Sequence, residues 1–205
     1  MNSARYLALG DSYTIGEGVA DDARWPVQLA AALRGESISL DPPEIIARTG
    51  WTTDELDAAI DAAAPQGPYA LVSLLIGVNN QYRGRNVGEY AQQFDALLRR
   101  ATGFAGGNAG RVLVLAIPDW GVTPFAIGLG RDRARIAREL DAFNAAAARS
   151  CAVHGVAFVD IAPVSRARGG EIAMLADDGL HPSAALYAEW TRLALPVARG
   201  LLSRP

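Results

Sequence analysis

Apolar and polar residues divide the chain into segments of two kinds. Some are short, nearly continuous apolar runs, such as YALVSLLIG at 69–77, which are typical of strands buried on both faces of a sheet. Others carry apolar residues at helical spacing, such as WPVQLAAAL at 25–33. The pattern predicts strands at 5–9, 43–49, 69–77, 111–118 and 156–160, and helices at 25–33, 52–63, 87–101, 131–153 and 183–201.

Predicted strands and helices alternate along all 205 residues. This order favours an α/β fold in which a five-stranded parallel sheet is covered on both faces, a three-layer α/β/α sandwich. The length fits a single domain over residues 1–205, and half of the residues are apolar, which suffices for a sizeable core. The glycine-rich segment 101–110 is interpreted as a flexible connection rather than a domain boundary.

Glycines and polar residues follow the predicted strands. They occupy positions 10–12, 49–51, 77–80, 118–120 and 160. Ligands bind outside the carboxyl ends of the strands in parallel sheets, so we expect reactive side chains at these positions. His154 precedes the last strand, at the opposite edge, and is interpreted as a surface or packing residue.

A serine, a histidine and an aspartate are available at this edge. His181, in ADDGLHPS, lies between the last strand and the last helix, three residues after Asp178. A carboxylate and an imidazole in one turn can pair, and the carboxylate then holds the ring tautomer. Ser12 needs a base to become a nucleophile, and His181 is a candidate for that role. The alternative is that Ser12 only begins a helix.

Four short motifs make the interpretation specific, because together they resemble the GDSL-like, or SGNH, hydrolase superfamily. They occur in the order found in that family. GDSYTIGEG carries Ser12 at the nucleophile position, RTGWTT carries Gly50, GVNN carries Asn79, and DDGLHPS carries Asp178 and His181.

The resemblance implies a flavodoxin-like sandwich and a catalytic triad of Ser12, His181 and Asp178. It also implies an oxyanion hole made by the backbone N–H groups of Ser12 and Gly50 and the side-chain amide of Asn79. Such donors stabilise the negative charge that develops during acyl transfer. A glycine at position 50 lets the backbone approach a substrate closely.

Two positions depart from the family's pattern. Tyr13 stands where a leucine is usual, and Asn80 stands where an aspartate is usual. Neither change removes a catalytic group, but the second leaves open how Asn79 is supported. Asp11 is interpreted as a brace for the turn before the nucleophile.

Substrate-binding residues are expected next to these motifs. The apolar, glycine-rich segment 119–130 could line an acyl pocket or move over it, with Trp120 and Phe125 as candidates, and Trp51 could act in the same way. All three aromatic residues could instead belong to the core. Asp119 and Asp160 are weaker candidates for substrate contact.

The remaining composition excludes several other functions. A net charge of −3 argues against a nucleic-acid binder, and the arginines between 131 and 138 alternate with acids, as on a solvated helix face. The only cysteine, Cys151, cannot form an intramolecular disulfide and is interpreted as a core residue. No cluster has metal-ligand spacing and no dinucleotide fingerprint is present, so no cofactor or metal is expected. Without a signal-like or membrane-spanning segment, we expect a cytoplasmic protein.

The sequence therefore predicts a serine esterase that cleaves small-molecule carboxylic esters through an acyl-enzyme on Ser12. An acyltransferase or thioesterase using the same site, or a non-catalytic binding module with the same fold, remain alternatives. The compact chain, without a long lid insertion, favours small or exposed acyl groups. The sequence does not fix the oligomeric state.

Overall fold

A five-stranded parallel sheet forms the centre of the computed structural model, which describes residues 4–203. The strand order is β2-β1-β3-β4-β5, the flavodoxin-like order. All five predicted strands are present. β1 has the predicted length and is shifted by one residue, whereas the other four are shorter than their predicted runs because the ends of those runs enter the adjoining turns. The strands are β1 (Tyr6–Gly10), β2 (Glu44–Ala47), β3 (Leu71–Leu75), β4 (Val112–Leu115) and β5 (Ala157–Val159).

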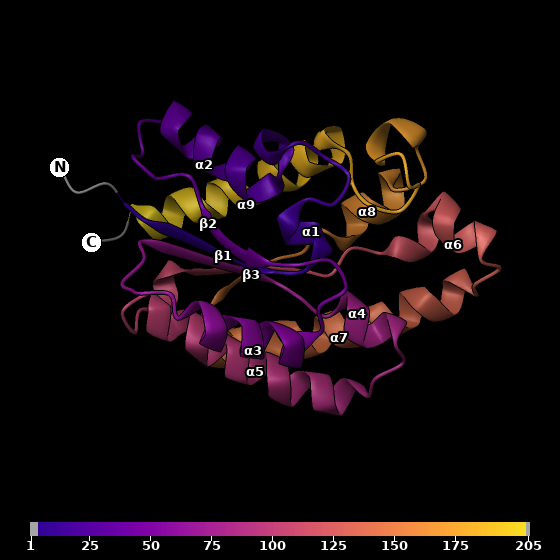
Figure 1. The fold of residues 1–205 in the computed structure, drawn as a ribbon, viewed down its shortest axis with the longest axis horizontal. Coiled ribbons are helices and arrows are strands. Elements are labelled where there is room, and N and C mark those ends of the chain that lie inside the picture. The colour runs from indigo at the N-terminus through magenta and orange to yellow at the C-terminus, as the bar shows by residue number, and fades with distance from the viewer. Residues whose placement is uncertain (1–3, 204–205) are drawn as a thin grey trace.

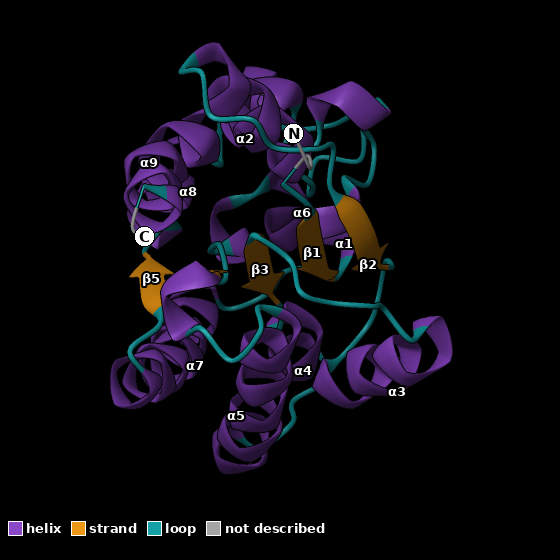
Figure 2. Cartoon of the chain, turned by 90° about the vertical axis from the view of Figure 1, so that its left-hand side faces the viewer, coloured by secondary structure: helices purple, strands orange, loops and turns teal. Residues whose placement is uncertain are grey.

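Helices cover both faces of the sheet, which confirms the predicted three-layer α/β/α sandwich (Figures 1 and 2). One face carries α2 (Trp25–Gly35), α8 (Ala162–Arg168) and α9 (Ala184–Leu202), and the other carries α3 (Thr53–Ala63), α5 (Val87–Phe104) and α7 (Arg133–His154). The sequence pattern did not predict α8 or the shorter helices, which are α1 (Ser12–Ile15), α4 (Val78–Tyr82), α6 (Pro124–Gly128) and the 3₁₀ turns η1 (Asp21–Ala23), η2 (Ala109–Arg111), η3 (Trp120–Val122) and η4 (Ile172–Met174).

The continuous apolar runs form the centre of the core. Every residue of β1, β3 and β4 is buried, as expected for strands with helices on both sides. The edge strand β2 is more exposed. Between the sheet and the solvent, α2 packs against α9, and the indole rings of Trp25 and Trp190 are fully buried.

The chain reverses its direction of travel across the sheet at β1. It goes from β1 to β2 on one side and then crosses to β3 on the other side of β1. The carboxyl ends of β1 and β3 therefore flank a topological switch point, where ligands bind in such folds. The two strands approach closely there: a Cβ atom added at Gly10 would lie 2.5 Å from the carbonyl oxygen of Leu75. Helix α1 begins directly after β1, and α4 begins soon after β3.

A buried pair of hydrogen bonds ties α4 to the start of α3. The side chain of Asn80 accepts a hydrogen bond from the backbone N–H of Thr53 (3.1 Å) and donates one to its hydroxyl (2.7 Å). Both residues are fully buried. An amide can accept and donate at once, whereas a carboxylate only accepts. Asn80, which departs from the family's aspartate, thus holds the first residue of α3 in place.

Replacing Asn80 tests this tie. Asn80→Ala would leave the buried N–H of Thr53 without its partner, and we expect the free energy of unfolding to fall by about 1–3 kcal/mol. Urea denaturation measures the loss. Asn80→Asp is the matched control: it retains an acceptor for the N–H and is expected to cost less. An equal or larger loss in Asn80→Asp would contradict the proposed role of the acceptor.

Candidate active site

The nucleophile candidate lies at the tightest turn of the switch point. Ser12 is the first residue of α1, directly after β1, and is 4% exposed. The preceding Asp11 is the N-cap of this helix, and its side chain accepts a hydrogen bond from the backbone N–H of Tyr13 at 3.0 Å. This cap separates the end of β1 from the start of α1 and fixes the turn that carries Ser12.

Asp11 braces this turn from inside the protein. It is fully buried, and one of its carboxylate oxygens has no hydrogen-bond partner among residues 4–203. Burial raises the pKa of Asp11 to about 7, although the hydrogen bond from Tyr13 opposes the rise. The hydrogen bond from the N–H of Tyr13 is the kind of contact that the bracing role expected from the sequence requires.

His181 and Asp178 form a pair in one turn, as their spacing predicted. The Nδ1 atom of His181 lies 2.5 Å from a carboxylate oxygen of Asp178. The other carboxylate oxygen accepts hydrogen bonds from the backbone N–H groups of Leu180 and His181, each at 2.9 Å. The three contacts fix the imidazole ring relative to its own backbone.

The same contacts control the charge of Asp178. Partial burial raises its pKa, but the hydrogen bonds from His181 and Leu180 outweigh this effect and bring the pKa below its usual value. Asp178 therefore remains a carboxylate throughout the pH range in which a histidine titrates. It can accept the Nδ1 proton of His181, which leaves Nε2 available to a neighbouring group.

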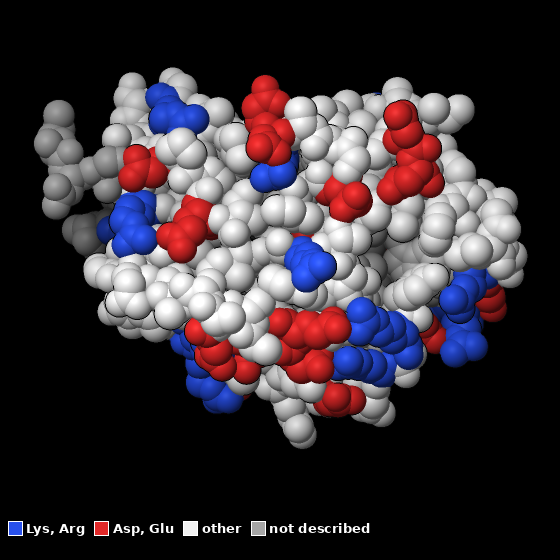
Figure 3. Space-filling model, viewed as in Figure 1, with Lys and Arg blue, Asp and Glu red and all other residues white. Residues whose placement is uncertain are grey.

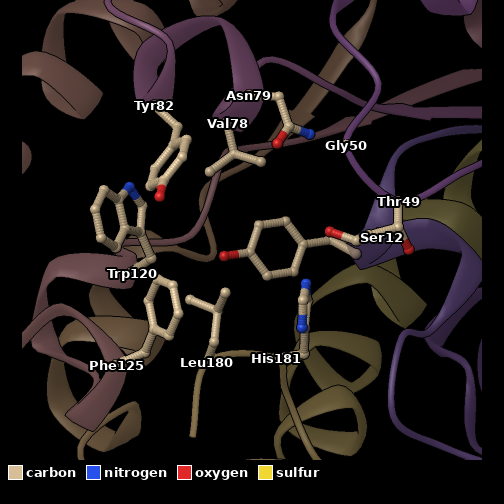
Figure 4. A pocket seen from close by; sticks show the side chains of 11 residues that line it. Ser12, Thr49, Gly50, Val78, Asn79, Tyr82, Trp120, Phe125, Leu180 and His181 are labelled. Atoms are coloured by element: carbon tan, nitrogen blue, oxygen red, sulfur yellow. The ribbon is translucent and has the colours of Figure 1, made fainter. Parts of the chain in front are cut away.

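One pocket brings the separate motifs together. Its volume is about 220 Å³, and its lining includes Ser12, Gly50, Asn79 and His181. Figure 4 shows these residues around one end of the pocket. They come from α1, from the loop after β2, from α4 and from the loop before α9. Asp178 does not line the pocket but contacts the ring nitrogen of His181 from behind.

Gly50 occupies a backbone conformation that suits glycine. Its φ of +89° is one that L side chains rarely adopt, although a Cβ atom there would meet only the guanidinium of Arg83, at 3.9 Å. That guanidinium donates a hydrogen bond of 2.6 Å to the carbonyl oxygen of Gly50 and also pairs with Glu55. The backbone conformation at this position, rather than lack of space, therefore requires glycine.

Asn79 holds the next peptide of the same loop. Its side-chain nitrogen donates to the carbonyl oxygen of Trp51 at 2.9 Å. A primary amide has two N–H groups, so the second remains available to a ligand in the pocket. The loop after β2 is thus held by α4 and the residue after it, at the carbonyls of Gly50 and Trp51.

The aromatic candidates divide into two groups. Trp120 and Phe125 line the pocket, as expected of the segment 119–130. Trp51 does not line it; its side chain is partly buried and packs against the hydrophobic core. The pocket lining also includes residues that the sequence analysis did not propose as substrate contacts: Tyr13, Thr49, Val78, Tyr82 and Leu180. Val78 and Tyr82 share one face of α4, which is too short to show periodicity in the sequence.

Tyr13 supports the histidine. Its ring contacts that of His181 edge-to-face, with 5.8 Å between ring centroids, and contacts Trp190 on another side at 5.9 Å. Burial raises the pKa of the phenol far above its usual value, so Tyr13 stays neutral. The departure from the family's leucine therefore places an aromatic ring against the imidazole.

Other titratable candidates lie outside this pocket. Asp119 is buried and pairs with Arg166 at 2.8 Å, and Asp160 accepts a hydrogen bond from the N–H of Ala162. His154 pairs with Asp95 at 2.7 Å, at the amino-terminal edge of the sheet. Burial raises the pKa of the Cys151 thiol to about 12.

Charged groups are interspersed over the surface. Figure 3 shows positive and negative side chains intermixed on one face, which is hollowed where α1, α4 and α6 meet in Figure 1. Among residues 4–203, no group of histidine, cysteine and acidic side chains is arranged to hold a metal ion. The described helices include none long and apolar enough to cross a membrane.

Comparison with known proteins agrees with this geometry. TesA shares 23% identity with a TM-score of 0.75, covering 96% of this chain and 99% of that one. The psychrotrophic esterase EstA from Pseudoalteromonas sp. shares 16% identity with a TM-score of 0.68, covering 98% and 94%. The acetylxylan esterase Axe2 from Geobacillus stearothermophilus shares 17% identity with a TM-score of 0.70, covering 100% and 98%. These similarities show a shared fold.

Family membership rests on the sequence. No curated protein matches the chain. The model of the GDSL-like lipase/acylhydrolase family, however, matches residues 8–189, which contain all four motifs. The resemblance inferred from those motifs is confirmed, and the chain belongs to the GDSL-like lipase/acylhydrolase family of ester hydrolases.

Proposed function

We propose that this protein hydrolyses carboxylic esters through an acyl-enzyme formed on Ser12. The observation that carries the proposal is the common pocket, which is lined by Ser12, by His181, itself held by Asp178, and by two further candidate oxyanion donors. The alcohol nucleophile, the base, the group that orients the base and the donors are thus all present in one place.

In the first half-reaction, the oxygen of Ser12 attacks the carbonyl carbon of the ester. His181 accepts the serine proton at Nε2, and its Nδ1–H remains bonded to the carboxylate of Asp178, which stabilises the imidazolium. The ester carbonyl oxygen becomes negatively charged. The backbone N–H groups of Ser12 and Gly50 and the side chain of Asn79 donate to that oxygen.

The first half-reaction ends when the tetrahedral intermediate collapses and the acyl group remains on Ser12. The departing alkoxide takes the proton from His181 and leaves as the alcohol. In the second half-reaction, His181 accepts a proton from water while the water oxygen attacks the acyl carbon. The second tetrahedral intermediate then collapses, His181 returns the proton to the oxygen of Ser12, and the free acid leaves. Protons and electron pairs balance without any further reactant.

Replacing the nucleophile is the primary test. Ser12→Ala should lower the hydrolysis of p-nitrophenyl esters by at least about 10⁴-fold, because no acyl-enzyme can form. Release of p-nitrophenolate gives the rate. Ser150→Ala is the control, since Ser150 lies on α7 and bonds to Asp95 of α5, outside the pocket, and its rate should match the wild type.

A fluorophosphonate probe tests the same residue independently of the substrate. Mass spectrometry should place the probe on Ser12 in the wild type and find none in Ser12→Ala. A wild type that is inert toward every ester and unlabelled would contradict the proposal and favour a binding module. Labelling without turnover would point to an acyl acceptor other than water.

The oxyanion donors are tested at Asn79. Asn79→Ala should lower kcat by about 10²–10³-fold with little change in KM, because the lost hydrogen bond forms mainly in the transition state. Asn108→Ala, at the cap of η2, serves as the matched control and should not alter kcat. A change confined to KM would show that Asn79 binds the substrate without stabilising the oxyanion.

A further inference from the structure

The pocket has two chemically different ends. Ser12, Thr49, Gly50, Asn79 and His181 surround the reacting end. The opposite end is formed by apolar and aromatic side chains, and the three aromatic ones are here called the aromatic wall: Tyr82, Trp120 and Phe125. Figure 4 shows the aromatic wall across the pocket from Ser12, with Val78 and Leu180 on either side of the region between them. Tyr13 also lines the pocket.

We propose that this space binds the acyl part of the substrate, and that the preferred acyl group is an unbranched apolar chain of about six to eight carbons. The proposal rests on the proposed ester hydrolysis, because it assumes that the carbonyl carbon lies at Ser12. It names the substrate class that the sequence left open, and differs from the small acyl groups that the compact chain suggested.

The lining excludes charged acyl groups. No Asp, Glu, Lys or Arg is among the residues that line the pocket, and its titratable histidine, His181, lies at the reacting end. A carboxylate or ammonium group in this space would lose its hydration without gaining a partner, which is costly. An acetyl group would end close to the reacting atoms and leave the aromatic wall uncovered, so it would gain little from the pocket.

The size of the pocket sets the length of the chain. A cavity of about 150 Å³ lined by apolar side chains holds one benzene molecule, which has six carbons. The volume here is about 220 Å³, so it admits roughly half as many atoms again. Part of that volume belongs to the ester group itself. The remainder fits an acyl chain of about six to eight carbons.

The aromatic wall is held in place, so it limits the length of the bound chain. The indole N–H of Trp120 donates to the side chain of Gln81 at 2.8 Å, and Gln81 in turn donates to Glu139 at 2.7 Å. The rings of Tyr82 and Phe125 contact Trp120 edge-to-face, with centroid distances of 5.4 and 6.5 Å. The wall is therefore anchored to α4 and α7.

The polar surroundings of Thr49 favour binding of the alcohol part of the ester on that side of the pocket. The hydroxyl of Thr49 donates a hydrogen bond to the exposed carboxylate of Glu17. An alcohol leaving group tolerates such polar neighbours, whereas an alkyl chain gains nothing from them. The acyl chain consequently extends toward the aromatic wall, and the alcohol leaves on the side of Thr49.

The experiment compares p-nitrophenyl esters with straight acyl chains of increasing length. We expect kcat/KM to rise about threefold to fourfold with each methylene from acetyl up to the six- to eight-carbon esters, and then to fall. Tyr82 is 42% exposed, so its removal opens the wall toward solvent. Tyr82→Ala should therefore shift the preferred chain length upward by at least two carbons. Ile127→Ala, on the exposed surface of α6 outside the pocket, should leave the profile unchanged.

Binding to Ser12→Ala separates this proposal from the proposed function. Calorimetry should show octanoate binding at least tenfold more tightly than acetate. If no ester is hydrolysed but octanoate binds in this way, the hydrolytic function fails and the acyl pocket stands. If esters are hydrolysed with acetyl preferred, or Tyr82→Ala leaves the maximum in place, the acyl-pocket proposal is overturned and the hydrolytic function stands.

Discussion

The parallel pairing of β1 with β3 is the constraint on which the rest of the site depends. Gly10 and Leu75, the last residues of these strands, are paired in register. Everything that follows each strand consequently emerges at the same edge. Ser12 enters the site because β1 ends there, and Asn79 enters because β3 ends beside it. The absence of a Cβ atom at Gly10 permits this approach.

Hydrogen bonds between loops then give the edge its definite shape. Three positions of the segment after β2 are held from α4 or just after it: the carbonyl of Gly50 by Arg83, that of Trp51 by Asn79, and the N–H of Thr53 by Asn80. Buried polar groups of this kind are costly to leave unpaired, so each bond favours one arrangement of the segment. The segment that carries Gly50 is thereby held by residues more than 25 positions away in sequence.

The pocket separates polar chemistry from apolar binding. The charge that would develop in the proposed acyl transfer needs donors, and the candidate donors Gly50 and Asn79 line the pocket together with Ser12. Binding of an acyl chain needs surface that water leaves readily, and the aromatic wall supplies it. Tyr13 connects the two, because its ring packs against His181 and lines the pocket as well. A substrate that fills the apolar end would therefore be held with its carbonyl group at the polar end.

The sequence by itself determined the α/β layering, the residues after each strand, and the pairing of Asp178 with His181, because these depend on local periodicity or on neighbours in one turn. Tertiary structure alone decided that Trp120 lines the pocket while Trp51 packs against the core, and that Tyr82 and Leu180 join the lining. It also decided that the side chain of Asn80 hydrogen-bonds to Thr53, the first residue of α3. Such contacts link residues distant in sequence, and they depend on how the loops pack, which no local pattern records.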